Sequence, residues 1–223
     1  MNERPLSSAE IDDEARFLRP LLRRPPWISF RSGNREERED TTIRTLFKRY
    51  RPGRAPHNVS LEMQAMVWQH DAIKTEFIPE ALKADETALI RAVQHAALVL
   101  HLLARGPVAS PNGLDFGRGC REGGLSDERF ARLMGTPKAN RLEAISRVMQ
   151  RLERAGKPLH WLAEDREKYS THWNARRTDT DEVWSMLNFL FGYNPNRSIT
   201  RWAAGFFRVE DAGETATDTA ETA

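Results

Sequence analysis

The clearest helical pattern in the chain lies between Leu125 and Trp161. Apolar residues spaced i, i+3 and i+4 predict a first helix, which Ser126 would cap and Gly135 would end. A second helix is predicted from 138 to 155, with apolar residues on one face and cations on the other. The apolar positions of the two helices are Phe130, Leu133, Met134, Leu142, Ile145, Val148, Met149 and Leu152. We expect an antiparallel pair that buries one side and exposes a positive surface.

Most of the remaining chain also has helical spacing of its apolar residues. The segments are 7–22, 41–51, 61–77, 87–103, 159–173 and 180–191, and the apolar cluster 201–208 follows them. The segment 87–103 is the most apolar and should lie at the centre of an N-terminal bundle. Its two histidines, His95 and His101, are six residues apart and would face different sides of the helix, so we expect core residues and not a metal pair. The pattern predicts an all-α protein.

A glycine- and proline-rich stretch, 106–124, has little periodicity and is the best candidate for a domain boundary. Neither a Walker pattern nor a GxGxxG motif fits its glycines, so a flexible connector is expected. The prediction is two small helical bundles joined by this Gly/Pro-rich linker, with a disordered acidic C-terminal tail. The predicted units are an N-terminal extension (1–40), an N-terminal helical bundle (41–112), a C-terminal helical bundle (113–208) and the tail (209–223).

The composition favours a globular protein of the cytoplasm and not one that crosses a membrane. Charged residues make up 30% of the 223 residues, and we find no uninterrupted apolar run near the ~20 residues that a spanning helix needs. The N-terminal residues lack the apolar core of a signal peptide. Cys120 is the single cysteine, which excludes a disulfide framework within one chain. Most of the six tryptophans are expected to be buried.

The net charge of +2 hides an uneven distribution. The segment 41–54 carries cations and no acid, the predicted helix pair is rich in arginine, and the tail is acidic. Two basic segments on separate helices favour a polyanionic partner, whereas either one alone could be a solvated helix surface. The candidates for nucleic-acid binding are Arg44, Lys48, Arg49, Arg51, Arg54, Arg118, Arg121, Arg129, Arg132, Lys138, Arg141, Arg147 and Arg151.

No group of residues predicts catalysis. The carboxylates Asp181 and Glu182 have the positions of first-turn charges on a solvated helix face. Cys120 lacks a neighbouring base, and no G-x-S-x-G elbow occurs. We therefore expect a protein that is not an enzyme and that has no metal, no cofactor and no small-molecule substrate.

The order of several segments carries a resemblance. SDERFARLM is followed by a helix ending in RVMQRL and then by GKPLHWLAEDREKY, with TLFKRYRPGR upstream. This order resembles the CasB family, the small subunit of the type I-E CRISPR surveillance complex called Cascade. The resemblance covers roughly 41–193 and lies in the spaced pattern of arginines and apolar residues.

The resemblance implies a helical protein without catalytic activity that binds nucleic acid without sequence specificity. It would stabilise the R-loop and hold the displaced non-target strand of the target DNA in antiviral defence. The implied partners are the other Cascade proteins, a second copy of the chain, crRNA and target DNA. In the family, a short arginine motif on the N-terminal helix faces nucleic acid, and Lys48 and Arg49 match it best.

Two alternatives stay open. A helix-turn-helix regulator would fit Ala131 four residues before Gly135, but Arg141 falls where that motif needs a buried aliphatic residue, and Pro137 lies near the start of its recognition helix. A helical scaffold that binds only proteins would use its basic faces for acidic partners.

Overall fold

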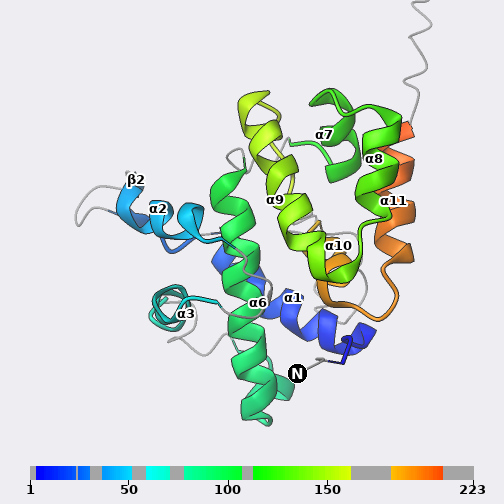
Figure 1. The fold of residues 1–223 in the computed structure, drawn as a ribbon. Helices are drawn as coiled ribbons and strands as arrows, with labels where there is room; N and C mark the ends of the chain where they lie inside the picture. The colour runs from blue at the N-terminus through cyan, green and yellow to red at the C-terminus, as the bar shows by residue number, and fades with distance from the viewer. Residues whose placement is uncertain are drawn as a thin grey trace, which may run out of the picture.

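The computed structural model describes residues 4–23, 25–30, 37–51, 59–70, 78–106, 113–161 and 182–207 (Figure 1). Regular structure in these residues is almost entirely helical, which confirms the predicted all-α class. The helices are α1 (Ser8–Arg23), α2 (Thr41–Arg49), α3 (Leu61–Trp68), α5 (Glu80–Lys83), α6 (Glu86–Arg105), α7 (Phe116–Glu122), α8 (Asp127–Met134), α9 (Lys138–Arg154), α10 (Glu182–Phe191) and α11 (Asn196–Phe207). The predicted bounds of α1, α2, α6, α8 and α9 agree with these to within two residues.

Helix α6 runs through the middle of the molecule. More than half of its 20 residues are buried, among them both histidines. In Figure 1, α2 and α3 lie on one side of it, whereas α9, α10 and α1 lie on the other. The buried side chains of the described residues form one continuous apolar cluster that extends from α1 to α11. α6 therefore joins the N-terminal and C-terminal helices.

By length and composition alone, α6 could cross a membrane. Its most apolar window has a mean hydropathy of 1.4, and 72% of that window is buried within the protein. The core helix of a globular protein meets the same test, and the packing of α6 accounts for its composition. The sequence shows no uninterrupted apolar run of this length, because Arg91, His95 and His101 interrupt the apolar residues of α6.

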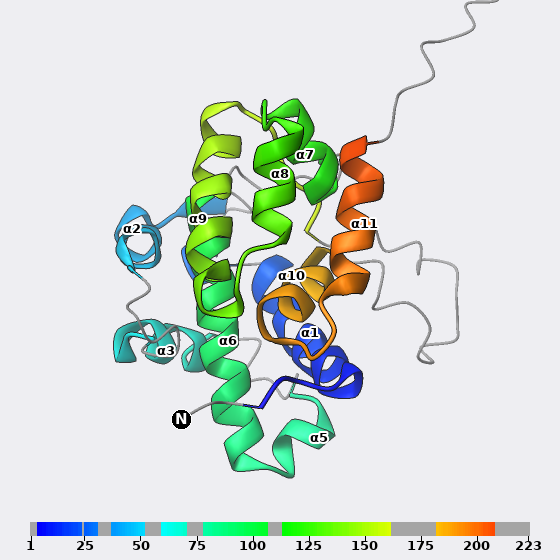
Figure 2. The ribbon, with the colours of Figure 1, turned by 45° about the vertical axis from the view of Figure 1, so that its right-hand side comes forward.

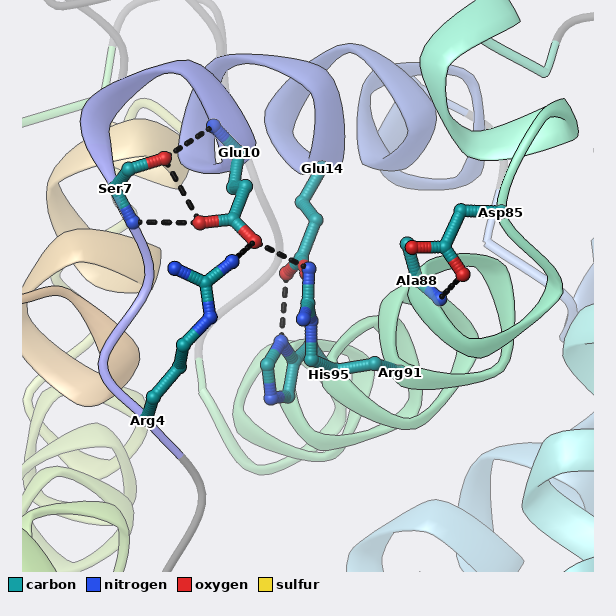
Figure 3. Close-up of polar contacts among 8 residues, drawn as sticks. All are labelled: Arg4, Ser7, Glu10, Glu14, Asp85, Ala88, Arg91 and His95. Atoms are coloured by element: carbon teal, nitrogen blue, oxygen red, sulfur yellow. Dashed lines mark hydrogen bonds and ion pairs between the residues drawn. The ribbon is translucent and has the colours of Figure 1, made fainter.

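A buried polar contact fixes α1 against α6 (Figure 3). The carboxylate of Glu14 lies 2.6 Å from Nδ1 of His95 and accepts a hydrogen bond of 3.2 Å from Nε of Arg91. Glu10 accepts from Arg91 as well, at 3.1 Å, and its second oxygen accepts from the backbone and hydroxyl of Ser7 as in a capping box. The His95 ring stacks on Phe191 of α10 at a centroid distance of 3.7 Å. The contact thus joins three helices.

The segment expected as an N-terminal extension contributes to the core. Phe17, Leu18 and Leu21 of α1 are fully buried, and α1 packs against α10 and α6. A short antiparallel hairpin follows, in which β1 (Ile28–Phe30) pairs with β2 (Glu37–Glu39). The sequence did not predict these strands, because each has only three residues and the second is a charged run.

The prediction of a flexible connector at 106–124 is wrong for residues 116–122, which form α7. A Cβ atom at Gly117 would collide with the backbone carbonyl of Trp202 in α11, and one at Gly119 would lie 2.7 Å from the side chain of Leu159. The glycines therefore allow α7 to pack closely against α11 and the 159 segment. Residues 107–112 lie outside the described residues.

The segment that follows α9 differs from the prediction. A helix was expected to begin at Leu159, but Leu159 instead forms an isolated bridge with Leu114, and the rest of that predicted helix, 162–173, lies outside the described residues, as do 71–77 and the tail. Of the tryptophans that the structure describes, all except Trp68 are buried, as expected.

His101 is fully buried where α2, α6 and α9 meet. Its Nδ1 lies 2.7 Å from the carbonyl oxygen of Phe47, and its Nε2 lies 3.3 Å from the hydroxyl of Ser146. Because a carbonyl can only accept, the proton is assigned to Nδ1, and Nε2 accepts from the serine. Burial lowers the pKa of His101 to about 4, so the ring is neutral near pH 7.

The low pKa of His101 predicts a loss of stability in mild acid. The unfolded chain takes up this proton near pH 6.5, whereas the folded protein takes it up only near pH 4. The free energy of unfolding should therefore fall by up to about 3 kcal/mol as the pH drops between these values. In His101→Asn, whose amide can still donate to Phe47, this part of the pH dependence should disappear. Urea unfolding at several pH values measures it, and an equal acid loss in the variant would contradict the assignment.

Candidate nucleic-acid interface

An open groove of about 750 Å³ lies between α8 and α9, which are side by side in both ribbon views (Figures 1 and 2). Apolar side chains of both helices and several arginines line it. The lining residues that matter here are Arg129, Arg132, Arg147, Arg151, Arg154, Glu143, Leu133 and Val148. Five arginines and one acid give the groove a positive lining.

The cap and the buried apolar stripe of α8 explain why the arginines of this helix point outward. Ser126 caps α8 by accepting from the backbone N–H of Arg129, and the apolar stripe of the helix is buried. Arg129 and Arg132 consequently lie on the exposed side, as the sequence predicted. Among the described residues, the guanidinium groups of Arg129 and Arg154 have no hydrogen-bond or ion-pair partner. These two cations are available to a ligand.

Two groove arginines pair with acids on their own helices. Arg132 lies 2.7 Å from Glu128, and Arg147 pairs with Glu143, both at i, i+4 spacing and well exposed. Exposed pairs of this kind contribute only about 0.3–0.5 kcal/mol. A phosphate could therefore replace the carboxylate at little cost.

Two other predicted cations take part in the fold. Nε and a terminal nitrogen of Arg151 donate to the carbonyl oxygens of Gly123 and Gly124 at 2.9 and 2.8 Å. Arg141 donates to the carbonyl oxygen of Thr136 at 3.1 Å and to that of Phe189 at 2.6 Å. Its guanidinium also lies over the Phe189 ring, 4.6 Å from the centroid. Burial lowers the pKa of Arg141.

The structure brings the two basic segments together at the C-terminal end of α9. Glu153 accepts from Lys48 at 2.7 Å and lies 3.9 Å from Arg44, although a hundred residues separate the two helices in sequence. Arg49 and Arg51 remain exposed beside this contact. Burial lowers the pKa of Arg105, and the nearby charge of Arg51 lowers it further. α2 therefore extends the basic surface of α9.

The remaining candidates lie elsewhere. Arg118 and Arg121 project from α7, where they pair with Glu122 at 2.8 Å and Asp127 at 2.5 Å. Lys138 is exposed at the first turn of α9. Arg54 lies outside the described residues. Arg154 also lines the groove and was not among the predicted binding residues, although the sequence places it on the basic face of the second helix.

Cys120 and Glu182 are both buried in the structure. Cys120 is buried in α7, and burial raises the pKa of its thiol, which disfavours the nucleophilic thiolate. Glu182 does lie in the first turn of α10, but the expectation that it is solvated is wrong. It accepts from the indole N–H of Trp202 at 2.8 Å and pairs with Arg201, and burial raises its pKa to about 7.

Comparison with known proteins gives no relative to this chain. No protein-family model, no curated protein and no solved structure matches it. The interpretation of the groove therefore depends on its own geometry and on the sequence resemblance.

The division into structural and free arginines predicts different effects on stability. Arg141→Met keeps the aliphatic stem but leaves two carbonyls without their charged donor, and should lower the free energy of unfolding by about 2–3 kcal/mol. Arg129→Met, the matched control on the groove surface, should change it by less than about 0.5 kcal/mol. Urea unfolding at pH 7 compares the two variants. Equal effects would contradict the division.

Proposed function

We propose that this chain is a non-catalytic small subunit of a CRISPR RNA-guided DNA surveillance complex of the type I-E Cascade kind. It binds nucleic acid without sequence specificity and stabilises the R-loop and the displaced non-target strand. The observation that carries the proposal is the groove between α8 and α9, with five arginines and one acid along its lining. The groove supports binding of nucleic acid, and the resemblance of the sequence to the CasB family suggests the Cascade complex as the assembly in which this binding occurs.

Arginines without a reacting group suit this role. Opening a target duplex against a guide RNA exchanges one duplex for another of nearly equal stability, so contacts to the phosphate backbone can shift the balance. Phosphate contacts carry no base-sequence information. Arg129 and Arg154 can bind phosphate without first breaking an ion pair with a described residue, which keeps the cost of binding low.

The packing of α9 disfavours the alternative of a helix-turn-helix regulator. A recognition helix must present its N-terminal residues to the major groove. Here α9 packs against α6, α7, α8 and α10, and Arg141 in its first half is held by the Phe189 carbonyl. The groove beside α8 is thus better placed to contact a polynucleotide backbone than α9 is to enter a major groove and contact bases.

The groove predicts a change in the salt dependence of binding. The double variant Arg129→Ala, Arg154→Ala should bind all sequences more weakly, and the slope of log affinity against log salt for single-stranded DNA should fall by about 1.4 because two phosphate contacts are lost. Fluorescence anisotropy with two unrelated oligonucleotides measures both quantities.

A control with the same change of charge separates the groove from a general charge effect. Arg16 of α1 is half exposed and Lys83 of α5 is 38% exposed, and both lie on helices remote from the groove (Figure 2). Arg16→Ala, Lys83→Ala should leave the slope unchanged. Equal losses in the two double variants, or none in either, would remove the groove from the binding site.

The proposed partners predict an assembly result. Mixed with crRNA and the other Cascade proteins, the chain should co-elute with them on size exclusion. The complex should contain two copies of the chain. When target DNA is added, the groove variant should still co-elute but should leave the displaced strand more reactive to permanganate, which modifies unpaired thymines. A chain that stays apart from all Cascade proteins would refute the proposal and favour a scaffold for other proteins.

A further inference from the structure

An exposed aromatic ring ends α11. Phe207 is 54% exposed, although it packs against two buried phenylalanines. Its ring is nearly perpendicular to those of Phe206 and Phe130, at centroid distances of 4.9 and 6.0 Å, and these two rings stack on each other at 4.0 Å. Contact with two fixed rings holds Phe207 in one orientation while leaving much of its surface open to solvent.

Helix α7, which packs against α11, carries two exposed arginines, each paired with an acid. The guanidinium of Arg121 lies 5.4 Å from the centroid of Phe206 and has a side-chain exposure of 56%. Arg118, one turn earlier in α7, is also exposed. An open aromatic surface beside arginines is the combination by which proteins bind unpaired bases, because the ring stacks on the base while the cations attract the phosphates.

The position of the ring relates it to the groove. In both ribbon views α8 lies between α9 and α11, with the groove on the α9 side of α8 (Figures 1 and 2). Phe130 of α8 contacts Phe207 on the other side of that helix. The ring and the groove are thus separated by about the 10 Å width of one helix. A strand bound in the groove can reach the ring by crossing α8.

We infer that Phe207 is a stacking platform for one unpaired base of a single-stranded polynucleotide whose phosphates lie along the α8–α9 groove. The inference rests on the proposed function and adds to it a contact that a duplex cannot make, because the bases of a duplex are already stacked. Stacking accepts every base, so the contact is consistent with binding that ignores sequence.

The experiment compares three ligands of equal length on the full chain: an oligothymidine, an abasic oligonucleotide with the same phosphates, and a duplex. Phe207→Ala should weaken oligothymidine binding about ten-fold, within the range for the loss of one stacked base. Binding of the abasic strand and of the duplex, and the salt slope for oligothymidine, should stay as in the wild type. Phe207→Trp should restore the affinity, because indole stacks at least as well.

Tyr193 supplies the matched control. Its ring is 81% exposed and it precedes α11, so it lies at the opposite end of that helix from Phe207. Tyr193→Ala should leave binding of all three ligands unchanged. Wild-type affinity of Phe207→Ala for oligothymidine, or an equal loss for the abasic strand, would overturn the stacking role.

The groove variant separates this inference from the proposal on which it rests. If Arg129→Ala, Arg154→Ala lowers the salt slope and Phe207→Ala has no effect, the platform alone is refuted. If Phe207→Ala weakens oligothymidine binding and the groove variant behaves as the wild type, the stacking contact stands and the strand follows another path. If the wild-type chain binds none of the ligands at low salt, both are refuted.

Discussion

The burial of α6 is the constraint on which the rest of the structure depends. A helix buried on most sides cannot leave its polar side chains without partners, because an unsatisfied polar group in the core costs about 1–3 kcal/mol. His95 meets this requirement with Glu14 of α1, and His101 meets it with the Phe47 carbonyl of α2 and the Ser146 hydroxyl of α9. The two histidines face different sides of α6, so their partners set the positions of α1, α2 and α9 around it.

This arrangement also decides which cations are left for a ligand. Where α9 faces the core, Arg141 is held by backbone carbonyls, and where α9 meets α2, Lys48 is held by Glu153. On the side toward α8, Arg151 is held by the carbonyl oxygens of Gly123 and Gly124, whereas Arg132 and Arg147 pair only with exposed acids. Arg129 and Arg154 are without a partner among the described residues, so these two are the groove cations left for a ligand.

The parts of the fold that local sequence determines could be predicted, and those that distant contacts determine could not. Helices α8 and α9 follow from their periodicity, caps and terminal glycines, which act within a few residues. By contrast, the glycines before residue 125 are typical of a loop, and only the close approach of α11 shows why Gly117 lies in a helix. Glu182 has the position of a solvated first-turn charge in the sequence, but in the fold Trp202 and Arg201 cover it.

The residues of the candidate site also divide into those set by local sequence and those set by distant contacts. Exposure of Arg129 could be predicted from the stripe of α8, whereas the inward turn of Arg141 depends on a carbonyl 48 residues away.

The pairing of the groove arginines bears on the kind of binding that the groove can support. Arg132 and Arg147 each have an acid one turn away, so at a distance much of their charge is cancelled, and the long-range field of the groove comes mainly from the unpaired arginines. At contact the pairs can open, because an exposed ion pair holds its cation weakly. At long range such a surface attracts a polyanion only moderately. At contact, Arg132 and Arg147 can exchange their acids for phosphates of the bound strand. The groove favours a ligand that other contacts have already brought close over a duplex captured from bulk solution, which is consistent with the proposed binding of a displaced strand.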